Sequence, residues 1–333
     1  MALIFEDTPD YYTLAAQTNV RYSSLPTLSL ATGNFGGNEY TTHTTPITKV
    51  LSYAISNTVP VNVGFWYRNI TVATATQTSL LTTNTDIANY VTLGVASGLN
   101  VLRSQTPAGF TSGTRTILDG EFHWIECSIL YSATGSGYIK VYVDGLLDIN
   151  FSGATISGTL PATLNTFTFG TLDYERGRWG SFYFWDGSGS DFNTFPRDPM
   201  RTNVLTPNAA GDLSEFTPLA GANYTNVNSG FAGTGNVSDG TTGKTDLYNF
   251  SNLSYTPNEV FCVVGNYYGQ NVGGVGTATL IPKIKTAGVT LSGTPQLLPL
   301  LNSDNLTEYF YTDASSALWT AVTVNAMQLG MGD

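Results

Sequence analysis

Hydrophobic and polar residues alternate most regularly between residues 119 and 153, in DGEFHWIECSILYSATGSGYIKVYVDGLLDINFSG. In the first half of this stretch Ile125, Cys127 and Ile129 alternate with Glu126 and Ser128, which is the period of two of a pleated strand. A Gly/Ser turn and a second alternating run, residues 138–143, follow. The pattern predicts an antiparallel meander.

The Asp144-Gly145 pair predicts a hairpin after the second strand, because a type I′ turn needs two residues with positive φ. The register has two alternatives. A two-residue loop places Leu147, Ile149 and Phe151 on the face of Tyr138, Lys140 and Tyr142, whereas a three-residue loop with a bulge joins them to Ile139, Val141 and Val143. We favour the bulged register, since it gathers the apolar side chains on one face.

Further strands are predicted on both sides of the meander. One of them, GRWGSFYFWDG, has aromatic residues on both faces, with Trp179, Tyr183 and Trp185 on one and Phe182 and Phe184 on the other. We expect this strand to be covered on both sides. The other predicted strands before residue 187 are ITKVLSYAIS, VNVGFWYR, TSLLTT, YVTLGV, residues 99–104 and LNTFTFG.

A segment rich in Pro and Gly separates two β-rich regions. Its prolines fix φ and remove hydrogen-bond donors, so it reads as a stiff connector. We expect a β-sandwich over residues 1–187, a connector over 188–212 and a second β-rich, sandwich-like domain over 213–333. Predicted strands of the last region are EVFCVVGNYY, ATLIPKIKTA, VTLSG, NLTEYFYTD and LWTAVTVNAMQLG, the last of which could end in a short helix.

Composition supports the same all-β class. Charged residues make up 11% of the chain and aromatic residues 12%, which favours short strands over long surface helices. The net charge of −11 argues against nucleic acid as a partner, because such binding needs clustered Lys and Arg. Cys127 and Cys262 are expected to be small buried apolar residues rather than a disulfide or a metal site. We see no signal-peptide pattern and no apolar run of membrane-spanning length, so we expect a protein made in a cytoplasm, with no membrane span.

The W-x-E strand and the YIKVYVDG strand and turn resemble the concanavalin A-like and laminin-G-like β-sandwich, an antiparallel jelly roll. The order of segments also resembles virion proteins of tailed bacteriophages. These have a laminin-G-like domain, a W-D-G-x-G turn with a Pro/Arg link, and a tail domain with a DG…TDLY segment ending in LWTAVTVNAMQLGM. The DG…TDLY residues here are Asp239, Gly240, Thr245, Asp246, Leu247 and Tyr248.

Residues for catalysis or metal binding do not form a known pattern. Glycoside hydrolysis needs two carboxylates facing a sugar, but Glu126 stands alone on its strand. Asp173 and Glu175, beside Arg176, are interpreted as a structural salt bridge or a solvated turn. The histidines, His43 and His123, are far apart in sequence, and metal, phosphate-loop and nucleophile-elbow motifs are missing. We therefore expect no enzyme activity and no cofactor.

The resemblance implies a structural component displayed on a tailed-bacteriophage virion, either a capsid decoration protein or a tail fibre or baseplate-associated protein. Its partners would be other virion proteins and further copies of itself in a homo-oligomer, and it would be assembled in the host bacterial cytoplasm. The alternative is a carbohydrate-binding module that recognises host-surface glycan. In that case sugar rings or a partner would contact aromatic side chains, for which the candidates are Trp66, Trp124, Trp179 and Trp185.

Overall fold

The computed structural model divides the chain into two compact units, residues 1–202 and 203–333, and each is described by itself. The description covers residues 3–7, 29–32, 38–41, 47–69, 78–86, 89–95, 101–117, 120–159, 163–169, 177–188, 193–197, 199–228, 235–273, 277–300 and 304–333. Within these ranges no helix has the length and apolar character to cross a membrane.

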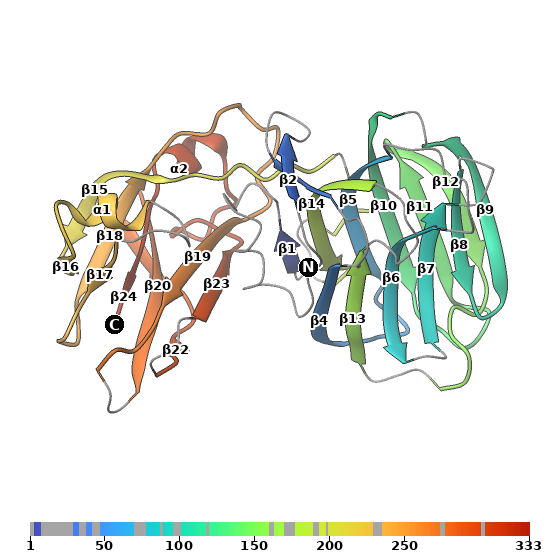
Figure 1. Ribbon diagram of the computed structural model, residues 1–333, viewed down its shortest axis with the longest axis horizontal. Helices are drawn as coiled ribbons and strands as arrows, with labels where there is room; N and C mark the ends of the chain where they lie inside the picture. Colours follow the sequence, from blue (N-terminus) through green and yellow to red (C-terminus); the bar gives the residue numbers. More distant parts are fainter. Residues whose placement is uncertain are drawn as a thin grey trace. The chain divides into compact units, whose positions relative to one another are not determined.

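The described part of the first unit contains two antiparallel sheets, which Figure 1 shows as two layers. The first sheet has the order β12-β11-β10-β5-β14-β3-β2, with β1 also paired to β14, and the second has the order β4-β13-β6-β7-β8-β9. The strands are β1 (Leu3–Asp7), β2 (Ser29–Thr32), β3 (Asn38–Thr41), β4 (Ile47–Ala54), β5 (Val61–Asn69), β6 (Thr78–Asp86), β7 (Asn89–Val95), β8 (Val101–Thr106), β9 (Gly109–Thr116), β10 (Phe122–Leu130), β11 (Tyr138–Val143), β12 (Leu146–Ser152), β13 (Thr163–Phe169) and β14 (Gly177–Asp186).

The core of this sandwich is built by the alternation read from the sequence. In β10, Ile125, Cys127 and Ile129 are fully buried, and they lie opposite equally buried residues of β5 and β11. Burial of such apolar side chains is the main favourable contribution to folding, about 25 cal/mol per Å² of apolar surface.

The β11–β12 hairpin combines features of the two alternative registers. Its turn has two residues, Asp144 and Gly145, both at positive φ, and a bulge at Asp148 follows. The bulge places Ile149 opposite Val141, as favoured from the sequence. The predicted loop length was wrong, and so was the face of Leu147, which pairs with Tyr142 and is exposed.

The bulge has a physical cause in the side chain of Asp148. Its Oδ1 accepts hydrogen bonds from the backbone N–H groups of Thr114 and Arg115 in β9, at 2.8 and 2.9 Å. Asp148 therefore links the edge strand of one sheet to the edge strand of the other. Gly113 has no Cβ, which leaves room for this carboxylate.

The second unit contains a sheet of order β15-β18-β24-β20-β21, with β22 also paired to β20, and the separate pairs β19–β23 and β16–β17. Together with the first unit, this confirms the predicted fold class, an all-β antiparallel sandwich followed by a second β-rich region. The elements are β15 (Pro207–Ser214), β16 (Thr217–Pro218), α1 (Asn223–Val227), β17 (Val237–Ser238), β18 (Thr245–Phe250), β19 (Val263–Gly269), β20 (Ala278–Thr286), β21 (Val289–Ser292), β22 (Gln296–Leu298), β23 (Asp304–Phe310), α2 (Ala321–Asn325) and β24 (Gln328–Gly332).

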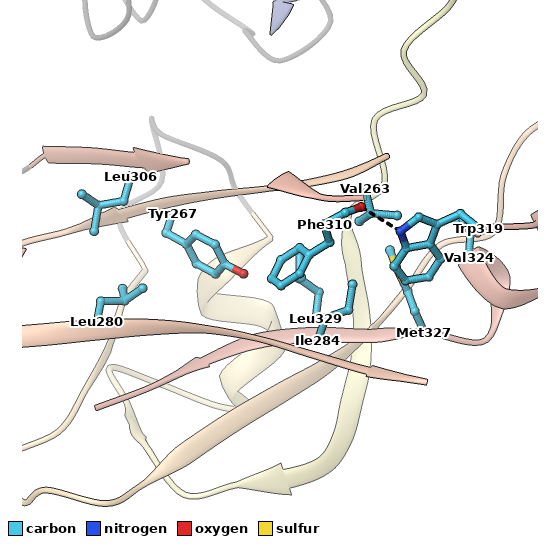
Figure 2. Packing of buried hydrophobic residues seen from close by; sticks show 10 residues of the cluster. All are labelled: Val263, Tyr267, Leu280, Ile284, Leu306, Phe310, Trp319, Val324, Met327 and Leu329. Carbon is cyan, nitrogen blue, oxygen red and sulfur yellow. Dashed lines mark hydrogen bonds between the residues drawn. The ribbon is translucent and has the colours of Figure 1, made fainter. Parts of the chain in front are cut away.

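The core of the second unit lies between the β19–β23 pair and the β20–β24 part of the sheet (Figure 2). Tyr267 and Phe310 from one layer face Ile284 and Leu329 from the other. Trp319 closes one end, where its Nε1–H donates to the carbonyl of Phe310 at 2.7 Å.

The LWTAVTVNAMQLG segment is only in part the predicted strand. Its middle forms α2, which begins after Thr320, and the strand β24 comes after the helix rather than before it. Thr320 and Thr323 form a capping box, in which each side chain accepts from the backbone N–H of the other residue. Capping starts the helix despite a β-branched sequence.

Candidate functional site

The outer face of the first sheet, which points away from the sandwich core, carries most of the residues singled out from the sequence. Strand pairing places Trp124 beside Trp66, and Glu126 beside Gly64. The Trp124 ring lies 5.4 Å from the Trp66 ring and 6.0 Å from the Tyr183 ring, measured between centroids. Trp124 and Glu126 are both fully buried, although they are on the outer face.

Residues 193–197 and 199–202, here called the covering segment, pack on this face. The backbone N–H of Arg197 donates to Glu126 Oε1 at 2.8 Å, and the indole N–H of Trp66 donates to the carbonyl of Met200 at 2.9 Å. The ring of Phe195 meets that of Tyr142 edge to face, with centroids 5.3 Å apart.

The covering segment lies within residues 188–212, the range predicted as a connector. Its last residue, Thr202, makes a side-chain hydrogen bond of 2.8 Å with Tyr183 of the first unit. Beyond the division at residue 203, Pro207 already belongs to β15, which pairs with β18. Most of the described residues of this range are thus held by one unit or the other.

The four candidate tryptophans do not share one surface. Trp66, Trp124 and Trp185 are on the outer face, whereas Trp179 packs in the sandwich core with its ring 5.2 Å from that of Tyr67. Trp124, Trp179 and Trp185 are at most 1% exposed, and Trp66 is partly exposed. Stacking on a sugar requires an open ring face, which the three buried side chains do not offer.

The predicted faces of β14 were wrong for Trp179. The register shifts between Trp179 and Phe182, so Trp179 lies on the core side with Phe182 rather than with Tyr183 and Trp185. An extra residue in a strand moves every following side chain to the other face. Gly180 lies in this bulge against the side chain of Trp66. A Cβ at position 180 would stand 3.0 Å from the Cβ of Trp66. The prediction that aromatic residues on both faces are covered is confirmed.

The carboxylates of Glu126, Asp144 and Asp148 make structural contacts. Asp144 at the hairpin accepts from the backbone N–H of Trp124 at 2.8 Å and lies 2.7 Å from Nδ1 of His123. In the ranges that the structure describes, no cluster of three or more His, Cys, Asp or Glu could hold a metal ion. His43, Asp173, Glu175 and Arg176 lie outside the described residues.

The two cysteines are not joined by a disulfide, as predicted. Cys127 is fully buried in β10, and burial raises the pKa of its thiol to about 12. A thiol with so high a pKa carries almost no thiolate at neutral pH and is a poor nucleophile. Cys262 is partly exposed, which differs from the predicted burial.

The DG…TDLY segment of the second unit forms a buried polar hub around Asp246, which is fully buried. Its Oδ1 accepts from the backbone N–H groups of Glu215 and Phe216, and its Oδ2 accepts from Asn223 Nδ2 and the Tyr248 hydroxyl. Burial, followed by the nearby charge of Asp246 and the hydrogen bond to it, raises the pKa of Tyr248 above its usual range. Four donors satisfy the Asp246 carboxylate, so we assign the DG…TDLY segment a structural role.

An exposed apolar surface on the second unit was not found from the sequence. Residues 268–272 lie against residues 296–300, because Asn271 and Leu300 form a β-bridge and the N–H of Asn271 donates to the carbonyl of Pro299 at 3.0 Å. We call this the 268/300 surface. Its exposed apolar residues are Val272 (67% exposed) and Leu300 (46%) beside the bridge. Tyr268 (51%) on β19 and Leu297 (68%) on β22 point away from the core on different layers. Such residues look like core residues in a sequence, since alternation alone does not tell a covered face from an open one.

Comparison with known proteins adds a fold likeness for about half of the chain. No protein family and no curated protein matches the sequence. Among solved structures, an endo-β-1,4-glucuronan lyase from the fungus Trichoderma reesei is 14% identical, covers 55% of this chain and 95% of its own, and has a TM-score of 0.38.

Two further structures give similar values. The binding domain of Paraclostridial Mosquitocidal Protein 1 is 12% identical over 55% of this chain and 48% of its own, with a TM-score of 0.41. A carbohydrate esterase from the Shiga toxin-encoding bacteriophage phi24B is 10% identical over 55% of this chain and 97% of its own, with a TM-score of 0.38. These three structures are a lyase, a binding domain and a carbohydrate esterase from a phage, and their activities are properties of those proteins.

Proposed function

We propose that this chain is a structural component of a tailed-bacteriophage virion that acts through contacts between subunits. The sequence resemblance motivates the assignment to a virion, and one structural observation supports a role in assembly. Trp124, Trp179 and Trp185 of the first unit are used in internal packing, whereas the 268/300 surface of the second unit leaves apolar side chains open. Exposed apolar side chains such as Val272 and Leu300, which lie beside one β-bridge, occur on surfaces that bind another protein.

In this proposal the second unit attaches the protein to the particle, and the sandwich is the displayed unit. The apolar residues of the 268/300 surface would be covered by a neighbouring virion protein. The covering segment, which is held by Glu126 and Trp66, keeps the outer face of the displayed sandwich closed. A closed face with buried tryptophans gives no support to the four tryptophans as a glycan-stacking platform.

Fractionation and labelling of particles test the proposal. Particles from the culture that produces the chain are separated on a density gradient, and antibodies to the chain locate it by electron microscopy. We expect the chain to sediment with particles and label one structure, the capsid or the tail. A chain that stays in the unsedimented fraction as a monomer would contradict the proposal, and a reproducible hit on a glycan array would favour the alternative.

A further inference from the structure

The edge strand β21 of the second unit is open and uncharged. Its sequence is Val-Thr-Leu-Ser, all four residues are exposed, and no described strand pairs with its outer side. An open, apolar, uncharged edge presents unpaired backbone groups to any other strand, and proteins normally block such edges with charge, proline or bulges.

The opposite edge of the same sheet is blocked in these ways. Strand β15 contains Pro207 and Asp212, and its pairing with β18 is interrupted by two register shifts. The edge that carries β21 continues past Pro295 into β22, with a change of register on β20. Within its four residues β21 has no charge, proline or bulge, so this part of the edge is available for pairing.

The apolar side chains of β21 extend the core face of the sheet. Leu291 pairs with Ile284 and Val289 with Thr286, and both of these partners on β20 are buried. Val289 is nevertheless 48% exposed and Leu291 39% exposed. Because they stand on the core side of an edge strand, a further strand at this edge would cover them.

The hairpin geometry fixes which backbone groups point outward. Ala287 and Gly288, both at positive φ, form a two-residue turn, so Thr286 and Val289 are a hydrogen-bonded pair. Hydrogen-bonded and non-hydrogen-bonded positions alternate along an antiparallel pair. The N–H and C=O of Thr290 therefore point away from β20, toward the open edge.

We propose that β21 pairs with β21 of a second copy of this chain, antiparallel, with Thr290 opposite Thr290 on a two-fold axis. In this register Val289 of each copy stands opposite Leu291 of the other, so both apolar side chains gain an apolar partner on the same face. Thr290 exchanges both of its outward hydrogen bonds with its copy.

The neutral strand also permits a second copy at this edge. The chain carries a net charge of −11, but the strand itself is neutral, so two copies meet without like charges at the seam. The neighbouring Lys285 is already ion-paired with Asp212, and Lys283 donates to Ser292 at 2.8 Å. A two-fold pairing uses both edges and stops at the dimer, which avoids the open growth that an unprotected edge otherwise permits. The inference concerns the second unit alone and does not depend on the proposed virion role.

Sedimentation velocity of the purified full chain tests self-association, over a series from about 1 µM to about 100 µM. We expect a monomer–dimer equilibrium, and Leu291→Lys should raise its dissociation constant about tenfold or more, because a charge on the edge strand opposes pairing. Val322→Lys is the matched control, since Val322 is 76% exposed and lies on α2. It should leave the dissociation constant unchanged. A wild type that stays monomeric, or equal effects of the two substitutions, would overturn the proposal.

Disulfide trapping tests the register without relying on a destabilising change. Thr290→Cys in a Cys262→Ser background brings two thiols onto the two-fold axis, where Cα atoms of a hydrogen-bonded pair are about 5.5 Å apart and a disulfide fits. We expect a covalent dimer under mild oxidation, formed roughly tenfold faster than with Val322→Cys in the same background. Equal rates would contradict the register, and capture of a different protein with no self-association would exclude a second copy as the occupant.

Discussion

Gly64 lies directly beneath the indole ring of Trp124 on the outer face of the first sheet. A Cβ at position 64 would stand 2.7 Å from Cζ2 of Trp124. The ring cannot move aside, because Trp124 is fully buried and packs against Trp66 and Tyr183. The glycine is therefore required by close packing and not by an unusual backbone conformation.

We predict that Gly64→Ala lowers the free energy of unfolding of the first unit by about 1 to 3 kcal/mol, the usual cost of overpacking. Urea unfolding followed by tryptophan fluorescence measures the change. Gly135→Ala is the control, since a Cβ at position 135 has nothing within 4 Å, and it should be close to neutral. An equal loss of unfolding free energy in both variants would show that close packing of Trp124 on Gly64 is not the cause.

We predict that Glu126→Ala loosens the covering segment. The substitution removes the acceptor of the Arg197 N–H, and a buried donor without a partner costs about 1 to 3 kcal/mol. Arg197 and Arg201 lie in the covering segment, so limited trypsin digestion reports on its opening. Cleavage there should become about tenfold faster, since about 1.4 kcal/mol corresponds to a factor of ten in the open population.

Glu121→Ala, on the exposed loop before β10, serves as the control and should leave the cleavage rate unchanged. Trp66→Phe should accelerate cleavage as well, because it removes the indole N–H that donates to the carbonyl of Met200. If trypsin cuts all of these variants at the wild-type rate, contacts other than those of Glu126 and Trp66 hold the segment.

We predict that Asp246→Ala destabilises the second unit by about 3 to 5 kcal/mol, because it leaves several buried donors without their acceptor. Hydrogen exchange with mass spectrometry measures protection separately in residues 203–333. Asp212→Ala removes a carboxylate with a 55% exposed side chain and should change protection little, because exposed ion pairs contribute little to stability. Loss of protection in both variants to the same degree would mean that Asp246 has no special role.

The meander from β10 to β12 was predictable because alternation and an Asp-Gly turn act locally. Its bulge was assigned only in part. Asp148 is the bulged residue because it binds the backbone of β9, at Thr114 and Arg115. Nothing in the sequence near Asp148 indicates these partners, which come from the other sheet.

The same limit applies to the candidate tryptophans. Their residue type suggested exposed stacking surfaces, but whether a ring on the outer face is open depends on what lies over it. Met200 and Arg197 lie more than 70 residues away in sequence from the residues they contact, Trp66 and Glu126. Likewise, alternation predicted β21 as a strand but not that its core face is open, since exposure is a property of the neighbouring layers.

Tyr267 gives a prediction for pH. Its hydroxyl is buried and has no hydrogen-bond partner among the described residues, and burial, with a smaller effect of the Glu308 charge, raises its pKa above the ordinary value. Below about pH 10 the hydroxyl is protonated in both folded and unfolded chains, so it gives no pH dependence. Above about pH 10 only the unfolded chain releases the proton, and stability falls by up to about 1.4 kcal/mol per pH unit until the raised folded pKa is reached.

We therefore predict that Tyr267→Phe is neutral or stabilising at neutral pH, because it removes a buried polar group that lacks a partner. It should also reduce the loss of stability above about pH 10. Both effects are measured by urea unfolding of the wild type and Tyr267→Phe at a series of pH values, with hydrogen exchange in residues 203–333 as the probe. Tyr268→Phe, at the neighbouring residue with 51% exposure, should leave the alkaline slope unchanged. A clear loss of stability in Tyr267→Phe at neutral pH would show that the hydroxyl has a partner, such as a buried water, and that its contribution is favourable.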